Sequence, residues 1–300
     1  MLLTTQTNRY KYTYIFSFFY IYYREKKDSD TWWKRKTIKV MTKETIKSHS
    51  IHTQTLTLIY KFRYISAPLL AELRHINRTV AFRTLETLYQ KDLLNKRFDK
   101  SYKLLGKPAS YSLNINGINY LKERMELNKN YAHTHYKNKI NSERFITESL
   151  DILRTFVVLN ESYPDAFTAF TKAEMTAFSD KFPKPLPHLY LNRMKLDKSR
   201  PNFYMLDILT GQDKKVIAAR IDKYFKHYES GDWEEEEQPV ILLVVADSYV
   251  ERETLKMIDS MKDSNYIEDD ELVFMLTTQK ALFSENKNIW TSKENELSTL

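Results

Sequence analysis

The chain of 300 residues contains no cysteine, only four glycines and no long apolar run. The absence of cysteine excludes disulfide bridges and zinc–thiolate sites, and it agrees with the reducing conditions of the cytoplasm. With so few glycines there is no glycine-rich loop to hold the phosphates of a nucleotide. A membrane-spanning helix needs about 20 continuous apolar residues, whereas the nearest stretch, residues 12–23, is shorter and consists mostly of Tyr and Phe. We therefore expect a cytoplasmic protein with no membrane partner.

Positive charge is concentrated in the first half of the chain. Residues 1–140 contain 27 Lys and Arg against 10 Asp and Glu, a net charge of +17. Residues 141–300 contain 20 against 29, a net charge of −9. Such asymmetry is typical of a protein in which one half faces a polyanion and the other half has a different task, although an accidental bias of composition is the alternative. The length suits two globular domains.

Residues 1–50 are expected to form an extension that is either disordered or upstream of the true start. Residues 24–39 are highly charged and show no helix or strand period, and Met41 offers another start. A functional aromatic arm is the other interpretation of the stretch 12–23. Without the first 40 residues, residues 41–140 still carry a net charge of +11, so the asymmetry does not depend on the extension.

The next part of the chain shows short amphipathic segments in the order helix, helix, helix, basic hairpin, helix. Apolar residues at helical spacing predict the helices, and alternation near the end of the hairpin predicts a returning strand. The segments are residues 55–63, 67–74, 78–92, 93–115 and 117–125. This order is that of a winged helix-turn-helix domain, which we place at residues 51–128.

The third helix, residues 78–92, is the candidate recognition helix. Ala81, Leu85 and Leu88 fall on its inner face, so polar and basic side chains of its first turns point outward. Such helices present these side chains to the major groove, and a basic hairpin contacts phosphates beside it. A solvated polar face and a lysine-rich loop without a partner are the alternatives. The predicted DNA-binding residues are Arg78, Thr79, Arg83, Lys96, Arg97, Lys100, Lys103 and Lys107.

A linker is expected at residues 129–141. It carries His133 and His135, an H-x-H pair that is able to bind a metal ion. A third ligand at useful spacing is missing, so two solvated histidines are the expected reading.

An α/β domain is predicted at residues 142–283, followed by a mobile tail at residues 284–300. A strong amphipathic helix opens it, and strands then alternate with helices, which implies a mixed or parallel sheet covered by helices. The predicted helices are residues 142–159, 212–228 and 249–261, and the predicted strands are residues 203–209, 240–246 and 272–276. The predicted fold class is thus α+β, a winged helix followed by an α/β domain.

A metal-dependent nuclease is the chemistry to test in this second domain. Such a site needs two carboxylates at a strand end to hold a divalent cation, and a lysine to orient water. Asn202 stands where the first carboxylate is expected, and Leu209 where the lysine is expected. Because a neutral amide weakens Mg²⁺ binding, we expect an inactive site. If a site remains, its members are Asp207, Asn202, Lys223 and Glu143 or Glu148, with Mg²⁺ as the cofactor.

The chain resembles the replication-relaxation family of plasmids and mobile elements. In the basic half the resemblance lies in LTLIYKFRYISAPLLAEL, RTVAFRTLETLYQKDLLNKR and YSLNINGINYLKER. Downstream it lies in His133, His135 and Asn141, in RPNFYMLDI and in KYFKHYE, so that it covers about residues 51–258. It implies a winged-helix DNA-binding protein and a second half like a degenerate restriction endonuclease, in which an acidic residue often follows the proline. Asn202 departs from that pattern.

The leading hypothesis is a DNA-binding accessory protein of a plasmid or mobile element. It would act in the replication, relaxation or mobilisation of DNA during conjugation, without being an enzyme. Its expected partners are double-stranded DNA and a relaxase or replication proteins, with a homodimer as an open alternative. The other hypotheses are a nuclease or nicking enzyme centred on Asp207, and a winged-helix transcriptional regulator.

Overall fold

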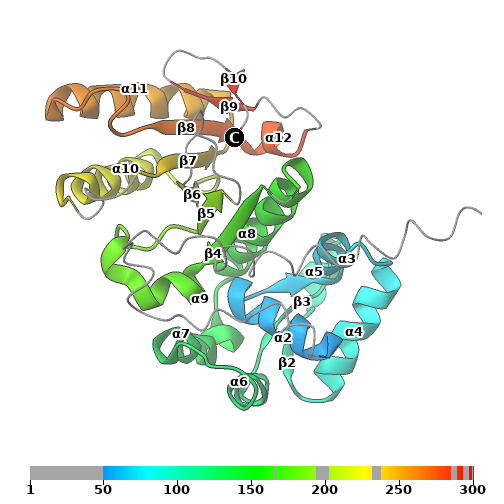
Figure 1. The fold of residues 1–300 in the computed structure, drawn as a ribbon. Helices are drawn as coiled ribbons and strands as arrows, with labels where there is room; N and C mark the ends of the chain where they lie inside the picture. Colours follow the sequence, from blue (N-terminus) through cyan, green and yellow to red (C-terminus); the bar gives the residue numbers. More distant parts are fainter. Residues whose placement is uncertain are drawn as a thin grey trace, which may run out of the picture. The chain divides into compact units, whose positions relative to one another are not determined.

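The computed structural model describes residues 50–164, 166–193, 203–231, 238–284, 289–292, 297, 298 and 300. Most of the expected extension and Asn202 therefore lie outside the described residues. The chain divides into two units, residues 1–153 and 154–300, and the division falls inside helix α8 (Glu143–Ser162). Each unit has its own sheet, and the chain as a whole is α+β (Figure 1).

From residue 50 onward, where the described residues begin, three helices of the first unit are interleaved with the strands of a three-stranded antiparallel sheet. The helices are α2 (Ile51–Phe62), α3 (Ala67–Arg74) and α4 (Arg78–Gln90). The strands are β1 (Ile65–Ser66), β2 (Leu94–Arg97) and β3 (Ser110–Leu113). Strand β3 lies in the middle, so the sheet order is β1-β3-β2.

Helix α4 follows directly from its sequence. The side chain of Asn77 accepts a hydrogen bond from the backbone N–H of Thr79 at 2.7 Å, which caps the first turn. Ala81, Leu85 and Leu88 recur at steps of four and three and are fully buried. The helix is therefore placed with one face in the core and the other in solvent, as predicted.

The hairpin between β2 and β3 contains an additional short helix, α5 (Lys100–Leu104). Asp99 caps it, because its carboxylate accepts hydrogen bonds from the backbone N–H groups of Ser101 at 2.9 Å and Tyr102 at 3.2 Å. Gly106 then turns the chain with a φ of +61°, a conformation that L side chains rarely adopt. The hairpin that the sequence predicts thus carries a capped helical turn at its tip, which the sequence pattern does not predict.

The segment predicted as a linker is folded onto the first unit. It forms α7 (Lys129–Thr134) and the 3₁₀ helix η5 (His135–Ile140), after helix α6 (Ile115–Lys122). His135 is 1% exposed and stacks on Tyr60, with ring centroids 5.2 Å apart. The prediction of two solvated histidines is wrong for His135, because helical spacing brings it onto the same buried face as Tyr131, against α2. His133 is exposed.

The second unit is built on a seven-stranded sheet of order β10-β9-β8-β7-β6-β5-β4. Neighbours among β6, β7 and β8 are parallel and the other neighbours with recorded registers are antiparallel, so the sheet is mixed, as predicted. The strands are β4 (Phe167–Thr171), β5 (Leu189–Arg193), β6 (Phe203–Ile208), β7 (Val240–Val245), β8 (Phe274–Thr278), β9 (Trp290–Thr291) and β10 (Leu297–Ser298).

Two crossover helices connect the parallel strands. Helix α10 (Lys214–Glu229) joins β6 to β7, helix α11 (Ser248–Asn265) joins β7 to β8, and the two helices pack against each other (Figure 1). Every residue of β7 is buried, as expected for a central strand of a covered parallel sheet. Shorter helices are α9 (Lys172–Met175), η6 (Thr176–Lys181) and α12 (Gln279–Leu282).

Part of the expected tail belongs to this sheet. Strand β9 pairs with β8 through Thr291 opposite Leu276, and the Trp290 side chain is fully buried. The prediction of a mobile tail from residue 284 is therefore wrong for Trp290 and Thr291. The tryptophan supplies apolar surface that packs in the core, whereas the polar residues around it indicated an exposed tail. None of the helices in the described ranges is long and apolar enough to cross a bilayer.

Candidate nucleic-acid interface

The outer face of α4 carries the side chains that the sequence predicts there. Arg78, Thr79 and Arg83 are all exposed. One guanidinium nitrogen of Arg78 lies 3.8 Å from a carboxylate oxygen of Glu72, yet 75% of the arginine side chain is exposed. An ion pair this open to water is weak, so it leaves the arginine able to contact another anion.

Lys96 of β2 points toward α4 instead of into solvent. Its ammonium nitrogen lies 2.7 Å from a carboxylate oxygen of Glu86, and the ring centroids of Phe82, Tyr89 and Tyr111 are 5.7–5.9 Å away. Lys96 is therefore a half-buried cation that fixes the strand to the helix, which differs from the exposed wing lysine that the sequence predicts. The sequence could not show this pairing, because Glu86 looks like a solvated residue of α4.

Glu86 stays ionised in this cluster. Burial alone would raise the pKa of Glu86, but hydrogen bonds from Lys96 and from the Tyr111 hydroxyl, at 2.6 Å, outweigh it and hold that pKa below its ordinary value. For Tyr111 both burial and the bond to Glu86 raise the pKa of the hydroxyl. The cluster is thus a neutralised pair with a hydroxyl donor, and it adds no net charge to the outer face of α4.

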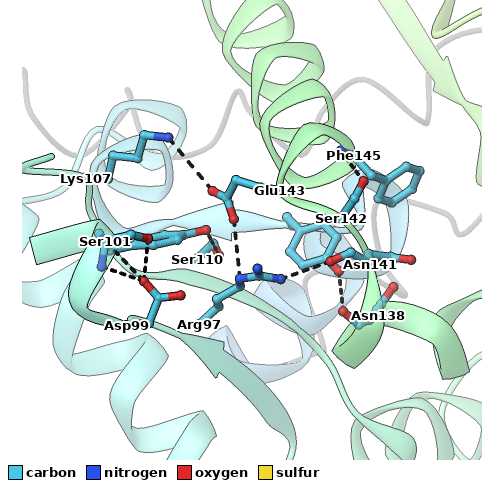
Figure 2. A network of polar contacts seen from close by, with 12 residues as sticks. Arg97, Asp99, Ser101, Lys107, Ser110, Asn138, Asn141, Ser142, Glu143 and Phe145 are labelled. Carbon is cyan, nitrogen blue, oxygen red and sulfur yellow. Dashed lines mark hydrogen bonds and ion pairs between the residues drawn. The ribbon is translucent and has the colours of Figure 1, made fainter.

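Arg97 and Lys107 share the carboxylate of Glu143, at the start of α8 (Figure 2). The Arg97 Nε lies 3.4 Å from one carboxylate oxygen of Glu143, and the Lys107 Nζ lies 3.9 Å from the other. Arg97 also donates to the backbone carbonyl of Asn141 at 3.0 Å. Both cations remain 37–44% exposed. The two sides of the hairpin are therefore tied to one carboxylate, which the sequence considers only as a substitute metal ligand.

Further hydrogen bonds extend this network beneath the hairpin. The Asn141 side-chain amide donates to the Tyr64 hydroxyl at 3.1 Å, and that hydroxyl donates to the Asn138 carbonyl at 2.5 Å. The Asn138 amide in turn donates to the Leu113 carbonyl at the end of β3, at 3.3 Å. Because these groups are buried or half-buried, the network holds η5 firmly against the sheet.

The eight predicted DNA-binding residues thus fall into three groups. Helix α4 exposes Thr79, Arg83 and Arg78, the last in an open ion pair with Glu72; helix α5 exposes Lys100 and Lys103; Lys96, Arg97 and Lys107 of the hairpin have carboxylate partners. The predicted roles of these residues remain predictions. What the structure adds is that Lys96, Arg97 and Lys107 brace the hairpin through their carboxylate partners, while the cations of α4 and α5 are exposed.

Asp207 of the second unit is buried among hydrogen-bond donors. One carboxylate oxygen accepts from Arg220 Nε and from the Tyr224 hydroxyl, the latter at 2.8 Å, and the other accepts from the His188 backbone N–H at 3.1 Å. The Arg220 guanidinium also donates to the Pro185 carbonyl at 2.5 Å. Burial alone would raise the pKa of Asp207, but the charge of Arg220 outweighs it and keeps that pKa below its usual value.

These surroundings do not fit a Mg²⁺ site at Asp207. Both of its oxygens are engaged by donors of the protein, and Lys223 is exposed on α10 and is not among these donors. Glu143 and Glu148 belong to the first unit. Within the described ranges, no three His, Asp or Glu side chains are grouped in a way that could hold a metal ion. Asp207 therefore acts as one half of a structural ion pair.

Sequence reasoning missed the partners of Asp207. Arg220 lies between Ile217 and Ile221 on the buried side of α10, and Tyr224 follows one turn later. A charged residue within an apolar helical stripe is the signal that was available, because it requires a buried partner. His188 gave no such signal. Its ring Nδ1 accepts from the backbone N–H of Ile208 at 2.9 Å, a contact set by strand pairing.

Comparisons with known proteins do not add a relative to these observations. No protein-family model matches the chain, and no match is found among curated proteins. The resemblance to the replication-relaxation family therefore stays a prediction from sequence.

Proposed function

We propose that the first unit binds double-stranded DNA as a winged helix. Helix α4 would lie in the major groove, and the β2–α5–β3 hairpin would be the wing beside it. The order of elements and the sheet order β1-β3-β2 support this, because both are those of winged-helix domains. Recognition helices of this kind place residues of their N-terminal half against base edges.

The observation that carries the proposal is the exposure of cations on α4 and on the hairpin that follows it. Arg78 and Arg83 lie on α4, and Lys100 and Lys103 lie on α5 of the hairpin, whose strand β2 packs against α4. Residues 51–140 contain 16 Lys and Arg against 6 Asp and Glu. A duplex carries a negative charge about every 1.7 Å along its axis, so a surface with this excess of cations attracts it more strongly than a neutral surface would.

The biological setting rests on the resemblance stated above. We propose a non-enzymatic accessory role in the replication, relaxation or mobilisation of plasmid or mobile-element DNA. The mixed sheet of the second unit agrees with the α+β class of a degenerate restriction-endonuclease-like fold and goes no further than that class. The buried pairing of Asp207 favours a structural or partner-binding role for that unit over cleavage.

The test is the salt dependence of DNA binding by the full chain, measured by fluorescence anisotropy with a labelled duplex. Removing one phosphate contact lowers the slope of log affinity against log salt by about 0.9. We expect Arg78→Ala/Arg83→Ala to weaken binding and to lower the slope by up to about 1.8. The control Lys122→Ala/Lys139→Ala removes the same charge from exposed positions on α6 and η5.

Two results would contradict the proposal. One is a wild-type chain that binds no duplex at low salt. The other is a control pair that weakens binding as much as the α4 pair, because affinity would then depend on total charge alone.

A further inference from the structure

Two leucines stand out at the tip of the β2–α5–β3 hairpin. Leu104 is 87% exposed and Leu105 is 66% exposed, while Phe98 just before α5 is 44% exposed. We call Leu104 and Leu105, which are adjacent in the chain, the hairpin-tip patch. Exposed apolar side chains that gather in one place mark a binding surface more often than scattered ones do.

The patch is held in place by the local structure. Tyr102 is buried, with its hydroxyl 3.3 Å from that of Ser110, and its ring meets Phe98 edge to face at 6.5 Å. On a helix, a residue two positions later points to the opposite side. Anchoring Tyr102 inward therefore directs Leu104 outward, and the Asp99 cap prevents the short helix from unwinding.

Cations surround the patch. Lys100 and Lys103 lie on α5, Lys107 follows the turn, and Asp99 is the one acidic residue between positions 98 and 108. The Lys103 ammonium lies 5.7 Å from the Phe98 ring centroid, so charge and apolar surface are interleaved. The partner of this tip must therefore offer an apolar slot between anionic groups.

We infer that Leu104 and Leu105 insert as an apolar wedge between base pairs in the minor groove, with Lys100 and Lys103 on the flanking phosphates. The inference rests on the proposed DNA binding. Leucine wedges of this type partly unstack a base step and kink the duplex by about 20–90°. Pyrimidine–purine steps unstack most easily, so the wedge selects such a step beside the stretch that α4 contacts.

Other occupants of the patch fit less well. Two copies of the tip would bring six lysines together, which opposes self-association through this surface. Helix α5 has five residues, too few for an amphipathic helix lying in a membrane interface. A base step between two phosphate rows offers both the apolar slot and the flanking anions.

The experiment measures DNA bending and affinity with the full chain. The probe is a duplex of about 30 base pairs, enriched from a random-sequence pool by the wild-type chain and labelled at both ends for energy transfer. We expect Leu104→Ala/Leu105→Ala to abolish the bend and to lower affinity about tenfold at every salt concentration, with an unchanged salt slope. Lys100→Ala/Lys103→Ala lowers the slope instead.

The matched control is Ile140→Ala on η5, which truncates an apolar side chain that is 80% exposed and leaves bend and affinity unchanged. Two results would overturn the wedge proposal while DNA binding stands. One is a wild-type chain that binds with steep salt dependence but leaves the duplex straight. The other is a leucine variant that still bends the duplex. A chain that binds no DNA overturns both proposals. Two other outcomes are possible in a leucine variant that still bends DNA. If it no longer binds phosphatidylserine vesicles that the wild type binds, the patch contacts lipid. If it no longer forms a dimer that the wild type forms, the patch contacts a second copy of the chain.

Discussion

His135 should make the first unit sensitive to acid. Its ring stacks on Tyr60 and meets Tyr131 edge to face, and its Nδ1 accepts a hydrogen bond from the Asn138 side-chain amide at 3.1 Å. Burial, reinforced by the charge of Arg63, lowers the pKa of His135 from 6.5 to about 3. The native state therefore keeps this imidazole neutral at pH values where the unfolded chain protonates it.

The size of the effect follows from proton linkage. Because the pKa is lower in the folded state, the contribution of His135 to stability is complete above pH 6.5 and is lost as the pH falls from 6.5 toward 3. One pKa unit corresponds to about 1.4 kcal/mol. Between about pH 7.5 and 4.5 the free energy of unfolding should fall by about 2.5–3 kcal/mol on account of this residue alone.

Urea unfolding followed by circular dichroism measures this loss in wild type and in His135→Phe. Phenylalanine keeps an aromatic ring between Tyr60 and Tyr131 but has no proton to gain, so the pH dependence of the variant should be shallower by that amount. His133→Phe is the matched control, because His133 is exposed and lies two residues away. Parallel profiles for wild type and His135→Phe, or an NMR titration of His135 near pH 6.5, would refute the reasoning.

Three further substitutions test the packing. Asp207→Ala should lower the free energy of unfolding by about 3–5 kcal/mol, because it leaves Arg220 buried and unpaired. Asp207→Ala/Arg220→Met should recover part of that loss in thermal denaturation. An Asp207→Ala variant as stable as wild type would contradict the buried pair. Gly117→Ala should cost about 1–3 kcal/mol, since its Cβ would lie 2.2 Å from the Leu93 carbonyl oxygen, and an unchanged urea midpoint contradicts that close approach. Asn77→Ala removes the cap of α4 and should cost about 1 kcal/mol, whereas Asn77→Ser should restore most of it in the same assay.

The Asp207 prediction changes how cleavage should be tested. A destabilised Asp207→Ala variant would lose any activity of the second unit for structural reasons. Loss of cleavage in that variant alone therefore does not identify a catalytic carboxylate. The double variant helps to separate the two explanations, because it recovers part of the stability without restoring the carboxylate.

Periodicity predicted the elements whose own residues decide their burial. Helix α4 has a repeating apolar face, and strand β7 is a continuous apolar run between polar segments, so both were predicted close to their observed bounds. Strands β4 and β5 were missed because they are short and mix apolar with polar residues. Their stability comes from pairing with each other and with β6, which a single segment does not reveal.

The candidate site was predictable in its residue types but not in its pairings. Lys96 and Lys100 are alike in sequence, yet one meets Glu86 and the other faces solvent. Whether a lysine meets a carboxylate depends on which distant segment folds beside it. For the same reason His135 looked solvated, because Tyr60 lies 75 residues earlier in the chain.

Glu143 gives the hairpin an anion of its own. In the proposed complex a phosphate that contacts Arg97 or Lys107 replaces this carboxylate instead of a salt ion from solution. Those contacts then contribute little to the salt dependence of binding. The number of phosphate contacts inferred from the slope is therefore smaller than the number actually made. The internal anion also lowers the attraction of the hairpin for any polyanion. If the proposed complex forms, the hairpin would therefore favour a duplex that fits its shape over a ligand that only matches its charge.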